Sequence, residues 1–174
     1  LIDRDGVINQ KAPRGEYITT WEDFVFLPEN IEGMRILAEA GYEFIVISNQ
    51  AGIARGMVTQ EAVDTINQQM KKELAREGIP VLDVLVCSHH WEEGCFCRKP
   101  SPGMLFKASR DWLFRLDKTF FIGDDPRDCQ AACNAGCGAI FIGERSEVEA
   151  LSPEEQPREV FSNLAEAVPF LTNS

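Results

Sequence analysis

The chain has 174 residues, of which 44% are hydrophobic and 26% are charged. This length fits one α/β domain over residues 1–174, with a full core and no room for a second large domain. The net charge of −11 and the pI of about 4.6 argue against nucleic-acid binding. No stretch is long and apolar enough to cross a bilayer, and no charged-then-apolar leader precedes residue 1. We therefore expect a cytoplasmic location without a membrane partner. We also expect the protein to be a monomer.

Helical periodicity and end signals recur along the chain. Asn30 is a candidate N-cap for a helix through Ala40, which Gly41 would end, and Thr59 is one for a long helix to about residue 77, where Gly78 follows. Further predicted helices span 102–113, 126–135 and 163–170.

Short apolar runs between these helices predict strands. The run at 44–47 is continuous and apolar, as expected for a buried parallel strand. Similar strands are predicted at 1–2, 81–86, 119–122 and 139–142, with a possible short strand at 24–26. The alternation predicts a Rossmann-like three-layer sandwich with a mostly parallel central sheet. The loops after Asn9 and Ser48 are too short to hold a large cap domain.

Polar clusters follow four of the predicted strands. They are Asp3 with Asp5, Ser48 with Asn49, the loop that leads to Lys99, and Asp124 with Asp125. Because parallel strands bring their carboxyl ends to one edge of a sheet, we expect these residues to converge there. Two acids one residue apart can divide labour: one carboxylate attacks an electrophile and holds a cation, and the other transfers a proton. Taken singly, each cluster could also be a turn or a helix cap.

In this order of motifs the sequence resembles the haloacid dehalogenase superfamily of aspartate-nucleophile phosphatases. The resemblance implies that Asp3 is the nucleophile, that Asp5 is the general acid and base, and that Ser48 and Lys99 bind the transferring phosphoryl group. It also implies a magnesium site formed by Asp3, Asp124 and the backbone carbonyl of Asp5. Mg²⁺ prefers such hard oxygen ligands and keeps several waters.

A second cluster lies between residues 87 and 97, in the sequence CSHHWEEGCFC. Cys87, His89, Cys95 and Cys97 supply the three thiols and one imidazole of a structural zinc site. With four protein ligands no position is left for water, so we expect this zinc to shape the loop and not to activate a nucleophile. His90 is an alternative to His89 as ligand, or else an outer contact or a substrate contact.

Three further cysteines follow each other at intervals of four residues, at Cys129, Cys133 and Cys137. No fourth ligand is evident near them. We interpret them as buried thiols that act as small apolar groups.

The metal-binding loop ends in CRKP, which resembles two related groups: D-glycero-D-manno-heptose 1,7-bisphosphate 7-phosphatases and histidinol-phosphate phosphatases. The segments DRDGVIN, SNQAGIARG and CRKPSPGM are closer to the heptose enzymes. Their substrate contacts carry over to residues of three segments, namely Asn49, Gln50, Arg55, Arg98 and Lys99. A substrate with a second phosphate needs a second cation, and the guanidinium of Arg98 can bind it bidentately.

Two features depart from the heptose pattern. Only five residues separate His89 from Cys95, a spacing also found in the histidinol group. Asp125 stands where the family often has a polar or basic residue, so it could add a metal contact or repel phosphate; Asp128 fits a later acid of the family, outside the metal's own ligands. The alternatives to a heptose bisphosphate phosphatase are a histidinol-phosphate or other small-molecule phosphatase and a catalytically silent, zinc-stabilised binding module.

Overall fold

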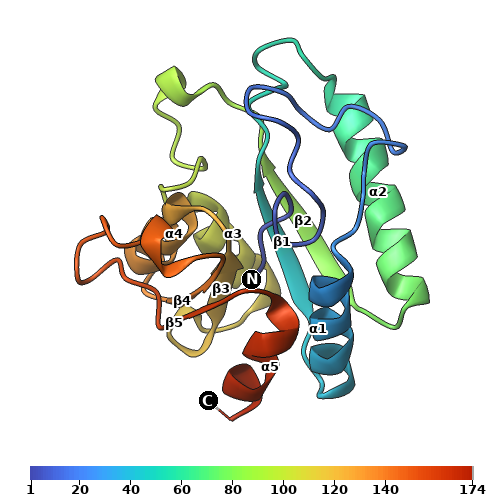
Figure 1. Ribbon diagram of the computed structural model, residues 1–174. Helices are drawn as coiled ribbons and strands as arrows, with labels where there is room; N and C mark the ends of the chain where they lie inside the picture. The colour runs from blue at the N-terminus through green and yellow to red at the C-terminus, as the bar shows by residue number, and fades with distance from the viewer. Residues whose placement is uncertain (174) are drawn as a thin grey trace.

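The structure is a computed structural model that describes residues 1–173. Its core is a parallel sheet with helices on both faces (Figure 1). The strands are β1 (Phe44–Asn49), β2 (Val81–Cys87), β3 (Phe120–Gly123), β4 (Gly138–Ile142) and β5 (Glu159–Phe161). The helices are α1 (Pro28–Glu39), α2 (Gln60–Arg76), α3 (Gly103–Trp112), α4 (Pro126–Ala135) and α5 (Leu164–Thr172). Short 3₁₀ turns lie at η1 (Trp91–Glu93), η2 (Leu116–Lys118) and η3 (Arg145–Glu147).

The first residues of the chain join the two parts of the sheet. Ile2 forms parallel bridges to Val46 of β1 and to Ile122 of β3. Its backbone N–H donates to Ile45 at 3.0 Å, and its carbonyl accepts from Ile47 at 2.9 Å. The strand order is therefore β2–β1–(Ile2)–β3–β4–β5, all parallel. The predicted strand at 1–2 thus lies in the middle of the sheet and delivers Asp3 to its edge.

Alternating side chains of the strands divide the core into two layers. Val46 and Ile122 face one layer, which α1, α2 and α5 cover, whereas Ile47 and Phe121 face the other, which α3 and α4 cover. Alternation places successive side chains on opposite faces of a strand, so apolar runs are needed where both faces are buried. The predicted three-layer α/β sandwich is confirmed.

Local details differ from the sequence-based prediction in three places. Asn30 does not cap α1, whose N-cap is Leu27; its buried side chain instead donates to the Val7 carbonyl and accepts from the Leu164 N–H, so it joins the N-terminal loop to α5. In the segment 24–26 only Phe26 pairs, in an isolated antiparallel bridge. Strand β5 has only three half-buried residues and lies in a segment without a strand signal in the sequence.

Two loops and the cysteine-rich segment extend from the carboxyl edge of the sheet (Figure 1). Residues 10–27 and 50–59 contain no helix, so no large cap domain is present in the described part of the chain. None of the described helices is both long enough and apolar enough to span a membrane.

Candidate active site and metal sites

Asp3 lies at the floor of a small cavity of about 110 Å³ at the carboxyl edge of the sheet. Its side chain is buried, and its Oδ1 lies 2.9 Å from the Nζ of Lys99. The same ammonium lies 2.7 Å from Oδ1 of Asp128 and donates to the Ile47 carbonyl at 3.1 Å. Three fixed partners therefore hold the Lys99 ammonium beside the Asp3 carboxylate.

Burial sets the charge balance around Lys99. It raises the pKa of Asp3 to about 7, although the charge of Lys99 acts in the opposite direction. Burial also raises the pKa of Asp128 against the same lysine. Burial alone would lower the pKa of Lys99, but its ion pairs with Asp128 and Asp3 outweigh this and raise it. Lys99 is therefore a permanent cation at the site.

Asp5 is held by three donors that surround its carboxylate. Arg4 Nη2 contacts both of its oxygens, at 3.1 and 3.0 Å, Gln50 donates to Oδ2 at 2.7 Å, and Asn9 donates to Oδ1 at 3.0 Å. Because three donors fix this carboxylate, its orientation is set before any substrate binds. The role of Arg4 could not be read from the sequence, since a charged residue after a strand is usually exposed.

Arg4 is fully buried. Its Nη1 donates to Asn67 of α2 at 2.9 Å, and its guanidinium lies 5.9 Å from the centre of the Phe24 ring. The side chain thus reaches from the sheet edge to α2 and connects the acid Asp5 to the core.

Asp124 follows β3 at the same edge of the sheet as Asp3. The carboxylates of Asp3, Asp124 and Asp128 offer oxygens that all lie within 4.8 Å of one another. Oδ1 of Asp124 is buried without a hydrogen-bond partner among the described residues, and Oδ2 pairs with Lys11 at 2.5 Å. Burial, helped by the charge of Asp3, raises the pKa of Asp124 to about 6 against the opposing Lys11. A divalent cation among these oxygens would relieve both the repulsion and the unpaired oxygen.

Gly6 allows the turn after Asp5 to lie close to the side chain of Asp124. Its φ is +95°, and a Cβ at this position would lie 1.8 Å from Oδ2 of Asp124. The turn after Asp5 therefore requires glycine for both conformation and space.

The last residues of β1 and the residue after it support the site through hydrogen bonds. Ser48 is buried, and its Oγ accepts from Gln50 at 2.8 Å, so Gln50 joins Ser48 to Asp5. The Asn49 side chain exchanges two hydrogen bonds of 3.1 Å with the backbone of Lys99. Of these three, only Asn49 lines the cavity of Asp3.

Asp125 lies at the N-cap of α4 and is engaged by Arg127. Arg127 Nε and Nη2 each donate to its carboxylate at 2.7 Å, and the Arg127 backbone N–H donates to Oδ1 at 2.9 Å. Burial opposes ionisation of Asp125, but the hydrogen bonds and charge of Arg127 outweigh it and lower the pKa to about 2. Asp128, not Asp125, belongs to the three-carboxylate group, and its Oδ2 accepts from the Asp125 N–H at 3.1 Å.

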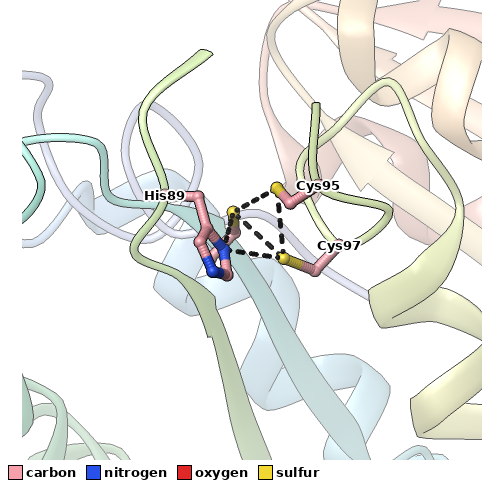
Figure 2. A group of neighbouring side chains, drawn as sticks. His89, Cys95 and Cys97 are labelled. Atoms are coloured by element: carbon pink, nitrogen blue, oxygen red, sulfur yellow. Dashed lines mark hydrogen bonds between the residues drawn. The ribbon is translucent and has the colours of Figure 1, made fainter. Parts of the chain in front are cut away.

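The four predicted zinc ligands offer ligand atoms that all lie within 4.8 Å of one another. Figure 2 labels three of them, His89, Cys95 and Cys97. The sulfur of Cys87 lies 3.6 Å from that of Cys95 and 3.3 Å from that of Cys97, and Cys95 and Cys97 are 3.4 Å apart. His89 Nδ1 lies 3.7 Å from Cys87 and 3.2 Å from Cys97. All these sulfurs are too far apart for a disulfide, but a tetrahedron with Zn–S bonds of about 2.3 Å has sulfur–sulfur edges of about 3.8 Å. The arrangement fits a four-coordinate zinc ion.

His90 takes no part in this group. Its Nδ1 accepts from the Glu92 N–H at 3.3 Å, and the His90 N–H donates to Glu93, so the residue caps η1. Arg55, in the loop after β1, has its guanidinium 5.5 Å from the centre of the Trp91 ring and 5.7 Å from that of the Tyr17 ring. Arg55 therefore connects its own loop with the loop of Tyr17 and with the cysteine-rich segment.

The fold, the buried aspartate beside a lysine, and the group of carboxylates define a phosphatase-type site of the haloacid dehalogenase class. A family model described as "HAD-hyrolase-like" matches residues 96–167. A relative from Rhodopseudomonas palustris, named D-glycero-beta-D-manno-heptose-1,7-bisphosphate 7-phosphatase, is 37% identical over 156 residues, which cover 85% of each chain. A relative from Photorhabdus laumondii, named D-glycero-alpha-D-manno-heptose-1,7-bisphosphate 7-phosphatase, is 32% identical over 166 residues. The match covers 91% of this chain and 86% of the relative.

Solved structures agree with these relatives. The crystal structure of D,D-heptose 1,7-bisphosphate phosphatase from B. bronchiseptica, complexed with magnesium and phosphate, has a TM-score of 0.88 at 30% identity and covers 99% of this chain and 96% of its own. This chain belongs to the heptose-1,7-bisphosphate 7-phosphatase family of haloacid-dehalogenase-like hydrolases.

Proposed function

We propose that this protein removes the 7-phosphate of D-glycero-D-manno-heptose 1,7-bisphosphate through an aspartyl-phosphate on Asp3. The observation that carries the proposal is the buried Asp3 carboxylate, held 2.9 Å from Lys99 at the floor of the cavity. The names of the relatives support the choice of substrate. In this proposal the chain acts on the small sugar phosphate as a cytoplasmic monomer of one domain.

Two side chains carry the chemistry. The Asp3 carboxylate attacks phosphorus, the bond between phosphorus and the O7 oxygen breaks, and Asp5 gives its proton to the leaving oxygen. Asp5 then takes a proton from water, which attacks the phosphorus of the aspartyl-phosphate and releases phosphate and free Asp3. The fixed ammonium of Lys99 offsets the charge that builds up on the phosphoryl oxygens.

Two metal ions complete the proposal. Asp3, Asp124 and the backbone carbonyl of Asp5 would hold Mg²⁺, with Asp128 close by. When bound, Mg²⁺ supplies positive charge that lets the anionic nucleophile approach the anionic phosphoryl group. Cys87, His89, Cys95 and Cys97 would hold Zn²⁺, which sets the shape of the loop that precedes Arg98 and Lys99.

The test is a comparison of substrates with purified protein and Mg²⁺. We expect kcat/KM for the heptose bisphosphate to exceed that for histidinol phosphate by roughly a hundredfold or more, since each charge-assisted contact to the second phosphate is worth about 1.5–3 kcal/mol. Both anomers of the bisphosphate are measured. Faster turnover of histidinol phosphate would contradict this proposal and favour a histidinol-phosphate phosphatase. If the protein turned over no phosphate ester, it would be a catalytically silent, zinc-stabilised binding module.

We expect Mg²⁺ binding to depend on pH. Because the metal-free pKa values of Asp3 and Asp124 are about 7 and about 6, protons occupy these carboxyls at pH 5.5–6 and compete with the ion. Affinity should therefore weaken as pH falls from about 8 to about 6: little above pH 7, and by roughly tenfold per pH unit below the pKa of each carboxyl that must lose a proton. Calorimetry in buffers of different ionisation enthalpy measures the released protons. Equal proton release at both pH values would contradict the assignment of these carboxyls as ligands.

We expect the substitution Cys97→Ser to remove zinc. Metal analysis should show about one zinc per chain in the wild type and a small fraction of this in the variant, because a tetrahedral structural site needs all four ligands. Burial raises the pKa of Cys87 to about 12 in the absence of metal, so zinc binding should also release protons. The control is Cys133→Ser in α4, which should keep its zinc. Full zinc retention in Cys97→Ser would contradict the ligand set.

A further inference from the structure

A second cavity of about 350 Å³ adjoins the cavity of Asp3. Lys99 and Arg127 line both cavities. The second cavity is also bordered by residues of the cysteine-rich loop and by Arg98. A ligand that places one phosphate beside Asp3 and extends past Arg127 therefore enters this second cavity.

Arg98 lines the second cavity and also carries a donor that has no partner. Its Nη1 is buried and has no hydrogen-bond partner among residues 1–173. An unpaired buried donor on a charged group is costly, and a phosphate oxygen is an acceptor that would pair with it.

Arg127 brings a second guanidinium, and Asp125 fixes its position. Two parallel hydrogen bonds of 2.7 Å use Nε and one hydrogen of Nη2, while half of the side chain stays exposed. A guanidinium has five N–H donors, so the donors that do not face Asp125 remain for a ligand. Asp125 is the N-cap of α4 and Arg127 lies in the first turn of the same helix, so neither residue is part of a flexible loop.

We propose that Arg127, positioned by Asp125, joins Arg98 in a two-guanidinium site for the phosphate that is not hydrolysed. The inference rests on the proposed function and makes Arg127 a specificity-determining residue for sugar bisphosphates over monophosphates. Two guanidinium groups also supply local positive charge in a chain whose net charge is −11, where a second phosphate would otherwise be repelled. Asp125 is then a positioning residue, neither a magnesium ligand nor a group that repels the substrate.

The test compares Arg127→Gln with Asp125→Asn and with the remote control Arg145→Gln. Each is measured on heptose 1,7-bisphosphate and on the 7-monophosphate. In Arg127→Gln we expect the ratio of the two kcat/KM values to fall by about tenfold or more, mainly through KM for the bisphosphate, since a charge-assisted pair is worth about 1.5–3 kcal/mol. Asp125→Asn, which keeps a capping side chain, should give a smaller fall, and Arg145→Gln none. An unchanged ratio in Arg127→Gln overturns the proposal.

A binding measurement separates this inference from the proposed function. The catalytically silent Asp3→Asn protein is titrated with fructose 1,6-bisphosphate and with fructose 6-phosphate by calorimetry, with and without Arg127→Gln. If the protein binds the bisphosphate more tightly than the monophosphate, and Arg127→Gln abolishes this difference, the two-guanidinium site is supported. This holds even if the heptose bisphosphate is not turned over. Absence of any such preference, in a protein that does turn over the heptose bisphosphate, overturns the site and leaves the proposed function intact.

Discussion

In Asp3→Asn, turnover of the heptose bisphosphate should fall by a factor on the order of 10⁴ or more, because an amide cannot attack phosphorus and loss of a nucleophile removes the reaction path. The fold should remain, since Asn has the shape of a protonated Asp and the Asp3 carboxyl, with a pKa of about 7, is partly protonated in the metal-free protein at neutral pH. Initial rates with saturating Mg²⁺ and far-UV circular dichroism check both expectations.

The matched control is Asp117→Asn, which changes an exposed aspartate that pairs with Arg115. This variant should keep wild-type rates. Substantial turnover by Asp3→Asn, with mass spectrometry showing that the introduced amide has not deamidated back to a carboxylate, would exclude Asp3 as the nucleophile. Trapping of an acyl-phosphate on Asp3 of the wild type by rapid acid quench gives independent support.

In Arg4→Met, stability and catalysis should both fall. The variant leaves Asp5 and Asn67 without their common buried partner, and breaking a buried ion pair typically costs about 3–5 kcal/mol. Urea unfolding of the metal-free protein measures this loss of unfolding free energy. Because Arg4 orients Asp5 and does not touch the substrate, kcat should fall more than KM rises.

The control for Arg4 is Arg35→Met on the exposed face of α1. Arg35 pairs with Glu32 and Glu39 on its own helix, and such exposed pairs contribute little to stability because water and salt screen them. If Arg4→Met were no less stable than Arg35→Met, the buried link between Asp5 and α2 would have no energetic role. A destabilised Arg4→Met with normal kcat would limit Arg4 to a structural role.

Several features of the fold could be predicted because their signal is local. Thr59 caps α2 as expected, with its side chain accepting from Ala62, and Gly136 ends α4 in the left-handed conformation. The apolar runs mark the buried strands, since only strands covered on both faces need continuous hydrophobic sequence. Strand β5 lacks this signal because its residues are half-buried at the edge of the sheet.

Individual side-chain contacts between distant segments could not be predicted, beyond the convergence of the strand ends at one edge of the sheet. Asn30 is a residue type that often caps helices. Because it lies beside Val7 and Leu164, its buried side chain instead makes hydrogen bonds to the backbone of both. The sequence predicts a substrate contact for Asn49, which stays a prediction; the structure adds that its amide exchanges two hydrogen bonds with the Lys99 backbone. In both cases residue type limits the possible partners, and packing selects among them.

The sequence by itself determined the order of the helices and of the strands other than β5, the acids that follow the strands and the spacing of the four zinc ligands. These depend on periodicity and on short spacings, which the linear chain carries directly. Only the tertiary structure decided that Arg4 is buried beneath Asp5, that Asp128 shares Lys99 with Asp3, and that Arg127 borders both cavities. The physical reason is that burial and pairing of charged groups depend on which elements pack together, and identical residues would be solvated if those elements lay apart.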